Sequence, residues 1–169
     1  MRALVVFYSR TGITKKACNA IADALRANDT VEVQVEELID RADRSGMVGW
    51  LSGGRDATLK RPTEIEPVQA DPGAFDLVVI GTPVWAFTCA PAPRAFCEQF
   101  ADQISTVAFV ATMGGSGDRG AFEAMGKLCG TAPVATLALR ERFVKADSPE
   151  HFIGPVGSFA QVLLEEAGG

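Results

Sequence analysis

A short stretch near the start of the chain gathers three hydroxyl side chains and a glycine, at Ser9, Thr11, Gly12 and Thr14. An apolar run, residues 3–8, precedes it, and apolar residues at helical spacing follow it from Ile13 onward. The unbroken run predicts a strand covered on both faces, and the later spacing predicts a helix. The first N–H groups of a helix lack partners within it and lie at the positive end of its dipole. A strand, a hydroxyl-rich turn and a helix N-terminus in this order predict a socket for a phosphate group.

A simpler interpretation of the same turn is that Ser9 or Thr11 caps the helix, as hydroxyl side chains before helices often do. The glycine and the third hydroxyl favour the phosphate socket, because Gly12 lets the backbone come close to a ligand. The turn has no Gly-x-x-x-x-Gly-Lys pattern, so a nucleoside triphosphate loop is not indicated. It also lacks the Gly-x-Gly-x-x-Gly pattern of the common dinucleotide turn.

Two later loops also carry groups that could contact a ligand, and each follows a predicted strand. Residues 81–88 come after the strand Phe75–Ile80 and contain the run Thr82, Pro83, Val84 and Trp85. Residues 112–120 come at the end of the strand Val107–Thr112 and contain Met113, Gly114, Gly115, Gly117 and Asp118. We expect all three loops to meet if their strands are neighbours in one parallel sheet.

The third loop allows a second interpretation. Gly115-x-Gly117-x-x-Gly120 spells a dinucleotide fingerprint between a predicted strand and a predicted helix, with Glu141 about twenty residues further on. A single match of this kind is a weak signal. Only one predicted strand follows it, which leaves little chain to build that kind of half-site.

Strands and helices alternate along the chain. Strands are predicted at 3–8, Val31–Glu36, Phe75–Ile80, Val107–Thr112 and Val134–Leu139. Helices are predicted from Ile13, at about Pro91–Ala101 and Ala121–Leu128, and from Pro155 with a C-terminal cap at Gly168. The alternation predicts an α/β fold in which one parallel sheet is covered by helices on both faces. Ligands bind such sheets beyond the carboxyl ends of the strands, where the strand order reverses.

Two details refine this prediction. Apolar and polar residues alternate strictly along Val31–Glu36, which is typical of a strand with one face in solvent and suits an edge position. Residues 40–72 form a long insertion, in which we expect a short helix near Gly46–Leu51, then coil and a turn at Asp71–Gly73. Trp50 in this insertion would either cover a ligand or fill a local core.

Length, charge and cysteine usage narrow the class of protein that the chain can be. The 169 residues fit a single domain, 1–169, and the net charge of −5 argues against nucleic acid and anionic membranes as partners. No run approaches the length of a membrane span and no secretory signal is evident, so a cytoplasmic location is expected. The four cysteines form no C-x-x-C pair, and together with the single His151 they make a poor set of zinc ligands. We therefore expect buried free thiols.

The three loops and their order resemble the flavodoxin-like family. Residues 8–14 are similar to the family's phosphate loop, residues 81–85 to its second flavin loop and residues 112–118 to its third. The resemblance implies a three-layer, doubly wound, five-stranded parallel sheet in the order 2-1-3-4-5 and flavin mononucleotide (FMN) as cofactor. It implies that FMN is bound by Ser9, Arg10, Thr11, Gly12, Ile13, Thr14, Thr82, Pro83, Val84, Trp85, Met113, Gly114, Gly115, Gly117 and Asp118.

Within this resemblance some residues keep two interpretations. Arg10, Lys15 or Lys16 would help to neutralise the phosphate, although the two lysines would equally suit the solvated face of the helix. Trp85 would stack on the flavin ring or plug the core behind its loop. Cys89 lies near the expected flavin, but no base or second cysteine adjoins it in sequence, which favours an unreactive thiol.

Three functional hypotheses follow. The first is an FMN-binding redox protein that shuttles electrons between protein partners, which the acidic balance favours slightly. The second is an NAD(P)H-dependent FMN oxidoreductase acting on quinones or similar small acceptors. It is favoured by the long insertion and by residues 112–120, where many flavodoxins have an aromatic residue and this chain has none. The third is an α/β binding module that retains the fold without a flavin.

Overall fold

The computed structural model describes residues 1–41 and 63–167, in which strands and helices alternate around one sheet. Five parallel strands stand in the order β2-β1-β3-β5-β6. These strands are β1 (Arg2–Phe7), β2 (Glu32–Glu37), β3 (Leu77–Trp85), β5 (Val107–Met113) and β6 (Ala135–Arg140). A short strand, β4 (Thr88–Cys89), pairs antiparallel with the end of β3.

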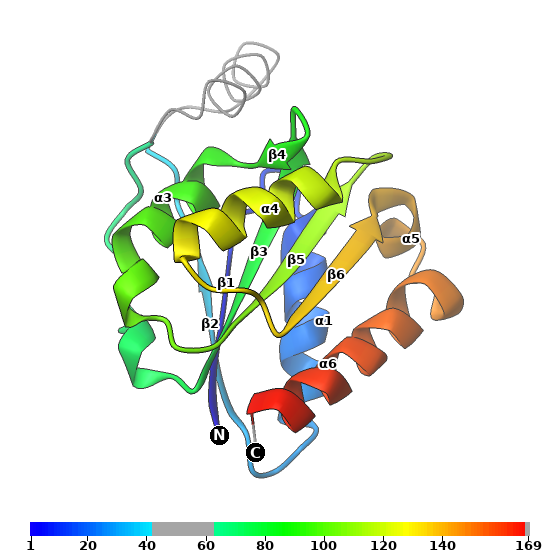
Figure 1. The fold of residues 1–169 in the computed structure, drawn as a ribbon. Coiled ribbons are helices and arrows are strands. Elements are labelled where there is room, and N and C mark those ends of the chain that lie inside the picture. The colour runs from blue at the N-terminus through cyan, green and yellow to red at the C-terminus, as the bar shows by residue number, and fades with distance from the viewer. Residues whose placement is uncertain (42–62, 168–169) are drawn as a thin grey trace.

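Helices cover both faces of this sheet, so the protein has three layers (Figure 1). On one face lie α3 (Pro91–Phe100) and α4 (Asp118–Cys129); on the other lie α1 (Ile13–Arg26) and α6 (Gly154–Ala167). Shorter helical segments are α5 (Glu141–Lys145), the 3-10 turns Pro72–Ala74 and Ala101–Gln103, and the π-helical turn Pro149–Ile153. The predicted three-layer α/β class is confirmed.

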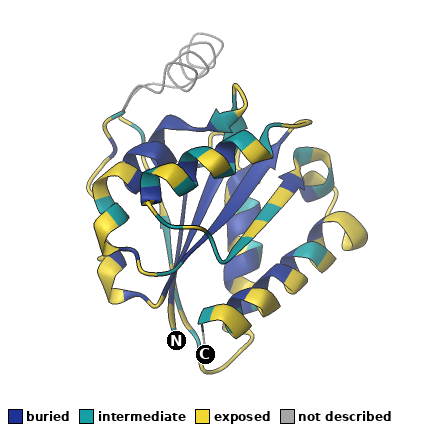
Figure 2. Ribbon diagram, viewed as in Figure 1, coloured by how far each residue is buried: buried dark blue, intermediate teal, exposed yellow. Residues whose placement is uncertain are grey.

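The central strands are buried on both sides, which explains their unbroken apolar runs. Along β1, Leu4 and Val6 belong to the core cluster under α3 and α4, whereas Val5 and Phe7 belong to the cluster under α1 and α6. All of these residues are buried, as Figure 2 shows for the middle of the sheet. The stripe predicted on the first helix, from Ile13 to Leu25, packs into the second of these clusters.

The five parallel strands have the predicted order. The predicted fourth and fifth strands are labelled β5 and β6 because the short strand β4 precedes them in the chain. The order reverses at β1, because β2 lies on one side of it and β3 on the other. The alternating strand lies at the edge beside β1, as predicted, and its valines are partly buried while Glu32 and Gln34 are exposed.

The largest correction concerns the predicted loop 81–88. The strand predicted at Phe75–Ile80 continues to Trp85, and after a tight turn β4 pairs with it, so this segment is a β-hairpin. Pro83 is tolerated here because β1 has ended by this point, with its last pairing to β3 at Phe7 and Gly81. On its other side β3 stays paired with β5 as far as Pro83 and Thr112.

Smaller corrections concern three helix starts. The helix predicted from Ala121 begins at Asp118, directly after Gly117, whose positive φ of 113° ends the preceding loop. Arg140 ends β6 and Glu141 directly begins α5, a short helix that was not predicted. The last helix begins at Gly154, one residue earlier than predicted.

Most of the insertion lies outside the described residues, and so do the helix predicted at 46–51, Trp50 and the cap predicted at Gly168. The described ends of the insertion are joined by an antiparallel bridge between Asp40 and Ile65. Two hydrogen bonds flank this bridge, from the Arg41 N–H to the Glu64 carbonyl and from the Glu66 N–H to the Ile39 carbonyl, each at 2.9 Å. The described ends of the insertion are therefore held together beside β2.

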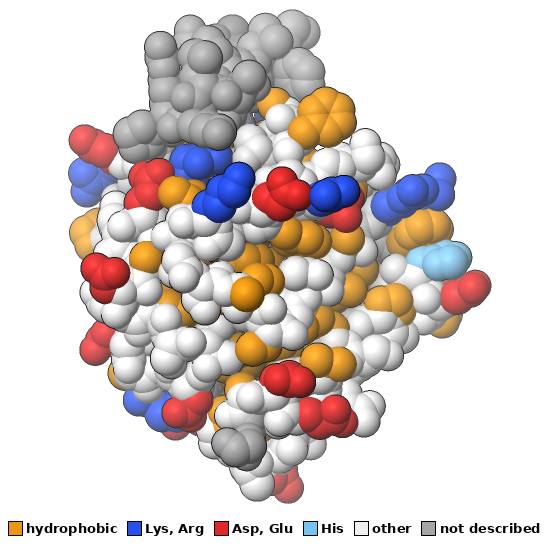
Figure 3. Space-filling model, in the orientation of Figure 1, with side chains coloured by type: hydrophobic (Ala, Val, Ile, Leu, Met, Phe, Trp, Pro, Cys, Tyr) orange, Lys and Arg blue, Asp and Glu red, His pale blue; other side chains and the backbone are white. Residues whose placement is uncertain are grey.

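The surface over α4 carries charges of both signs, and hydrophobic side chains show in the hollow beside that helix (Figure 3). Arg119 and Glu123 form an ion pair of 3.0 Å along α4. Within residues 1–41 and 63–167, none of the helices has both the length and the apolar character needed to cross a bilayer.

Candidate functional site

The carboxyl ends of β1, β3 and β5 meet at one rim of the sheet, as predicted for neighbouring strands. The Tyr8 N–H, directly after β1, donates to the Gly81 carbonyl of β3 at 3.2 Å. The hydroxyls of Thr14 and Thr112 are hydrogen-bonded at 2.8 Å, which joins the first loop to the third. This rim is the candidate site.

A cleft of about 160 Å³ opens at the rim. Its lining residues are Arg10, Thr11, Ile13, Thr14, Pro83, Val84, Trp85, Thr112 and Glu141. Pockets that enclose a whole ligand usually measure about 300–1,000 Å³. The cleft is therefore large enough for one part of a nucleotide-sized ligand, and the remainder would lie along the open rim.

The N-terminus of α1 faces this cleft without a side-chain cap. Gly12 is the N-cap residue with a φ of 84°, and no side chain among the described residues caps the helix. The interpretation of Ser9 or Thr11 as a cap is therefore wrong. The Ser9 Oγ atom is buried yet has no hydrogen-bond partner in the described part of the chain. Buried hydroxyls are nearly always hydrogen-bonded. A free hydroxyl beside free helix N–H groups therefore fits an anion such as the FMN phosphate.

The basic residues near the socket have separate roles. Arg10 lines the cleft and its side chain is exposed. Lys15 instead pairs with Glu37 at 2.7 Å, and Lys16 pairs with Asp147 at 2.8 Å. Neither lysine lines the cleft. Their interpretation as the solvated face of the helix therefore agrees with the structure, whereas Arg10 lines the cleft.

Trp85 packs on the core and also faces the cleft, so its contact with the core is confirmed. It is half-buried, packs against the core cluster under α3 and α4, and also lines the cleft. Its ring meets that of Tyr8 edge to face, with centroids 5.6 Å apart and an interplanar angle of 89°. Tyr8 thus fixes the orientation of an aromatic wall, which is a favourable arrangement for such a pair.

Thr82 has a structural role that the sequence did not indicate. Its hydroxyl accepts a hydrogen bond from the Ala90 N–H at 3.0 Å and donates to the Pro83 carbonyl at 2.9 Å. These bonds tie the end of β4 to β3. The side chain is fully buried, so its hydroxyl holds the hairpin in place and does not face the cleft.

The third loop divides into open and packed parts. Gly114 and Gly115 are exposed, and a Cβ atom added at either would have no neighbour within 4 Å, which leaves room for a ligand. Met113 is buried, so only its backbone could reach a ligand. Asp118 is half-buried at the start of α4 and does not line the cleft.

Two of the three fingerprint glycines pack against protein. A Cβ atom on Gly117 would lie 2.7 Å from Val84 Cγ1, and one on Gly120 would lie 2.1 Å from the Phe87 carbonyl oxygen. Both glycines therefore make room for the β3–β4 hairpin. The Gly-x-Gly-x-x-Gly spacing has a packing explanation, and β5 is followed only by the edge strand β6. The structure does not favour the dinucleotide interpretation.

Replacing Thr14 with valine is expected to destabilise the protein by about 1–3 kcal/mol, because it leaves the buried Thr112 hydroxyl without its partner. Replacing both threonines with valine is expected to recover most of that loss, since no unpaired polar group remains. Urea unfolding of the two single variants and the double variant measures this. A double variant as unstable as the sum of the singles would contradict the pairing.

The sequence did not indicate the roles of two residues, Glu141 at the cleft and Arg94 next to β4. Glu141 lines the cleft because β6 places the start of α5 beside the rim, and it also pairs with Lys145 at 3.4 Å. Arg94 is only 4% exposed, and its Nη2 donates to Thr88 Oγ1 in β4 at 3.2 Å, while its Nε has no partner within the described chain. No local sequence pattern indicates either role, because each role depends on the packing of segments that are distant in the sequence.

The cysteines are buried and free, as predicted. Burial raises the pKa of the Cys89 thiol, and the nearby Arg94 charge lowers it by less. Cys89 therefore remains a protonated thiol at neutral pH, which supports the unreactive interpretation.

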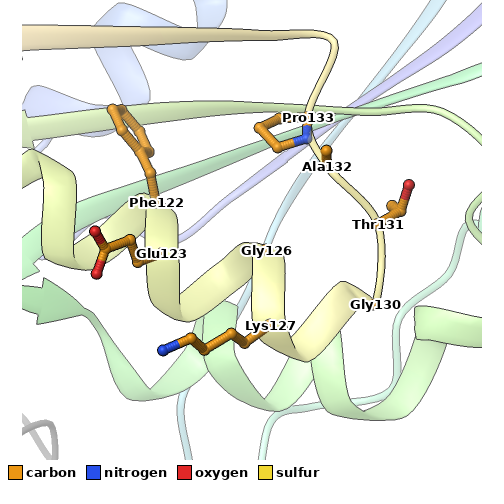
Figure 4. A pocket seen from close by; sticks show the side chains of 8 residues that line it. All are labelled: Phe122, Glu123, Gly126, Lys127, Gly130, Thr131, Ala132 and Pro133. Atoms are coloured by element: carbon orange, nitrogen blue, oxygen red, sulfur yellow. The ribbon is translucent and has the colours of Figure 1, made fainter.

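A larger hollow of about 610 Å³ lies elsewhere, between α4 and the turn that leads into β6. Phe122 and Pro133 stand on two sides of it, and Glu123 and Lys127 extend away from that turn (Figure 4). This hollow is at the amino end of β6. Because ligands of parallel α/β sheets bind at the carboxyl ends of the strands, we place the functional site at the rim.

The fold and the rim define a doubly wound α/β protein with its candidate site at the point where the strand order reverses. The family model described as Flavodoxin matches residues 2–142. The match spans most of the chain, so the protein belongs to the flavodoxin family, as the three loops indicated.

Solved structures agree with this fold. A flavoprotein from Lactobacillus acidophilus, solved in complex with FMN, has a TM-score of 0.67 at 20% identity, covering 86% of this chain and 96% of that one. The Streptococcus pneumoniae TIGR4 flavodoxin gives 0.60 at 17% identity, covering 98% and 99%. The two-electron reduced flavodoxin of Megasphaera elsdenii gives 0.58 at 15% identity, covering 94% and 98%. A comparison with curated proteins finds no match.

Proposed function

We propose that the rim binds FMN and that the protein transfers electrons between protein partners. The observation that carries this proposal is the buried Ser9 hydroxyl near the N-terminus of α1, since among residues 1–41 and 63–167 this hydroxyl has no hydrogen-bond partner and the helix has no side-chain cap. Membership of the flavodoxin family and the FMN complex of the Lactobacillus acidophilus flavoprotein support the choice of FMN. The net charge of −5 suits docking to basic partners.

The residues of the rim have distinct roles in this proposal. Ser9, Thr11 and the first N–H groups of α1 would hold the phosphate, and Arg10 would balance its charge. Trp85, with Val84 and Pro83, would provide the apolar wall of the ring site. Backbone groups at Gly114 and Gly115 would face the polar edge of the ring, where the structure leaves space. When bound, FMN supplies a centre that accepts and donates electrons one or two at a time.

The runner-up is an NAD(P)H-dependent oxidoreductase acting on quinones or similar acceptors. The exposed Gly114 and Gly115 and the absence of an aromatic side chain at residues 112–120 favour it, because a small acceptor needs access to the ring. Steady-state turnover of a quinone by the FMN-loaded protein, with NADPH as the sole donor, distinguishes the two. Slow turnover is expected for the carrier, whereas rapid turnover without an added reductase would establish the oxidoreductase.

Replacing Arg10 with glutamine is expected to weaken FMN binding by about 3- to 10-fold, because a charge-assisted contact to the phosphate is lost. The loss should shrink at high ionic strength, where exposed charges are screened. Isothermal titration at two salt concentrations measures both effects. Arg26→Gln is the matched control, since Arg26 lies at the other end of α1 and contacts Asp23 and the Val33 carbonyl. Equal losses in the two variants would contradict a local phosphate contact.

A further inference from the structure

Three buried cysteines lie together in the core cluster under α3 and α4. Cys89 belongs to β4, Cys97 lies within α3, and Cys129 is the last residue of α4. The side chains of Cys97 and Cys129 are hydrogen-bonded to each other, so two thiols from different helices are in direct contact. Contact between two sulfur atoms is the first condition for a disulfide bond.

The two thiols in contact differ in how easily they lose a proton. The hydrogen bond from the Cys97 thiol lowers the pKa of Cys129, and burial raises it by less. The same hydrogen bond, together with burial, raises the pKa of Cys97 well above its ordinary value. The thiolate is the reactive form of a cysteine, and the sulfenic acid that it forms with an oxidant condenses with a neighbouring thiol. Cys129 is therefore suited to react first and Cys97 to react second.

Cys129 is also the member of the pair that solvent reaches. It is 5% exposed, whereas Cys97 is fully buried. Helix α4 ends at Cys129, and the next residue, Gly130, takes the left-handed conformation with a φ of 65°. Gly130 lines the hollow of about 610 Å³ beside α4 (Figure 4). A small oxidant such as hydrogen peroxide would approach the Cys129 sulfur from this end of the helix.

A buried positive charge lies close to the second thiol. Arg94 is only 4% exposed, and its Nε has no hydrogen-bond partner within residues 1–41 and 63–167. Its charge lowers the pKa of Cys97, although by less than Cys129 and burial raise it. Oxidation of Cys129 removes the thiolate that raises the pKa of Cys97. The charge of Arg94 would then favour the Cys97 thiolate, which is the form needed to close a disulfide.

We propose that Cys97 and Cys129 are a redox-active pair, which hydrogen peroxide converts to a disulfide between α3 and α4. The Cys129 thiolate attacks one peroxide oxygen, the O–O bond breaks, and the departing hydroxide takes up a proton to become water. The Cys97 thiolate then attacks the sulfenic sulfur of Cys129. The S–S bond forms, the S–O bond breaks, and the second hydroxide takes the proton that Cys97 gave up. The two sulfur atoms lose two electrons in total, which reduce one peroxide to two waters.

This pair is separate from the proposed FMN site, because neither cysteine lines the rim cleft. Disulfides in reducing compartments are usually transient, and they return to thiols through exchange with small or protein thiols. The pair would therefore respond reversibly to peroxide whether or not a flavin is bound.

The first test treats the reduced, folded protein with hydrogen peroxide and counts its free thiols after unfolding. The count is expected to fall from four to two, and dithiothreitol should restore all four. Peptide mapping after alkylation should find one disulfide, between Cys97 and Cys129. The matched control is the same treatment in concentrated urea, where the contact between the helices is lost and mixed pairings should appear.

The second test separates the roles of the two cysteines. In Cys97→Ala the sulfenic acid on Cys129 has no thiol to condense with, so dimedone should label Cys129 after peroxide treatment. In Cys129→Ala the remaining thiols should stay reduced, and dimedone should not label Cys97. Cys89→Ala is the matched control, because Cys89 belongs to the same core cluster and this variant should still form the disulfide. Circular dichroism of each variant checks that it folds.

Several results would overturn this inference. Four intact thiols at a peroxide dose that fully oxidises glutathione would show that the pair is unreactive. A disulfide between Cys89 and Cys129, or one between two chains, would show that the contact between α3 and α4 does not direct the pairing. Dimedone labelling of Cys97 in Cys129→Ala would contradict the assigned order of reaction. None of these measurements involves flavin, so each of these failures would leave the proposed function standing.

Discussion

Replacing Gly81 with alanine is expected to destabilise the protein by about 2–4 kcal/mol, because the new methyl group has no room. A Cβ atom at this position would lie 2.3 Å from Cys18 Sγ and 2.9 Å from Phe7 Cβ. Both neighbours are fully or almost fully buried, Cys18 in α1 and Phe7 in β1. Gly81 therefore allows α1 to pack closely on the centre of the sheet, and thus sets the position of the phosphate socket.

Cys18→Ala is expected to relieve part of this clash, since it removes the sulfur atom that is nearest to the new methyl group. On its own, Cys18→Ala should cost about 1 kcal/mol through the small cavity it leaves. Combined with Gly81→Ala, it should give a protein more stable than the sum of the two single changes predicts. Urea unfolding of all four proteins measures this coupling.

Cys97→Ala provides the control for that cycle, because Cys97 is buried in the other core cluster, under α3 and α4. Its effect should simply add to that of Gly81→Ala. Coupling with Cys97 of the same size as with Cys18, or no coupling with Cys18, would contradict the packing described for Gly81.

Replacing Ser9 with alanine is expected to raise the stability of the flavin-free protein and to lower its affinity for FMN. The flavin-free protein should become more stable by about 1 kcal/mol, because the buried hydroxyl has no partner among the described residues. FMN binding should weaken by about 10- to 30-fold, since the same hydroxyl would donate to the phosphate. A purely structural serine would not produce this combination.

Two measurements test this expectation, urea unfolding of the flavin-free protein and FMN titration of the folded protein. Ser158→Ala serves as the control, because Ser158 is exposed on α6 and should change neither quantity by much. Loss of stability in flavin-free Ser9→Ala would show that the hydroxyl already has a partner. Unchanged FMN affinity would remove Ser9 from the socket.

Features encoded by local pattern were predictable from the sequence. The unbroken apolar run of β1 and the stripe of α1 identify a buried strand and a helix, so the start of α1 at Ile13 was predicted correctly. The alternation of strands and helices then required a parallel sheet. In such a sheet the three loops meet at one rim once their strands are neighbours, and the structure confirms this.

Features that depend on contacts between distant residues were not predictable. The extension of β3 to Trp85 depends on its pairing with β5, and β4 exists because it pairs with the end of β3. Glu141 lines the cleft only because β6 ends at the rim and α5 begins directly after it. The glycines at 117 and 120 resembled a nucleotide motif, but their cause is the hairpin packed against them.

The most direct test of the account is a fluorescence titration of the flavin-free protein with FMN and, separately, with riboflavin. Saturation at one FMN per chain is expected, with riboflavin bound more weakly by at least about 100-fold, because riboflavin lacks the phosphate that the socket would contact. Equal affinities for the two flavins would show that the socket from Ser9 to Thr14 does not hold the phosphate. Absence of FMN binding would contradict the proposed function itself.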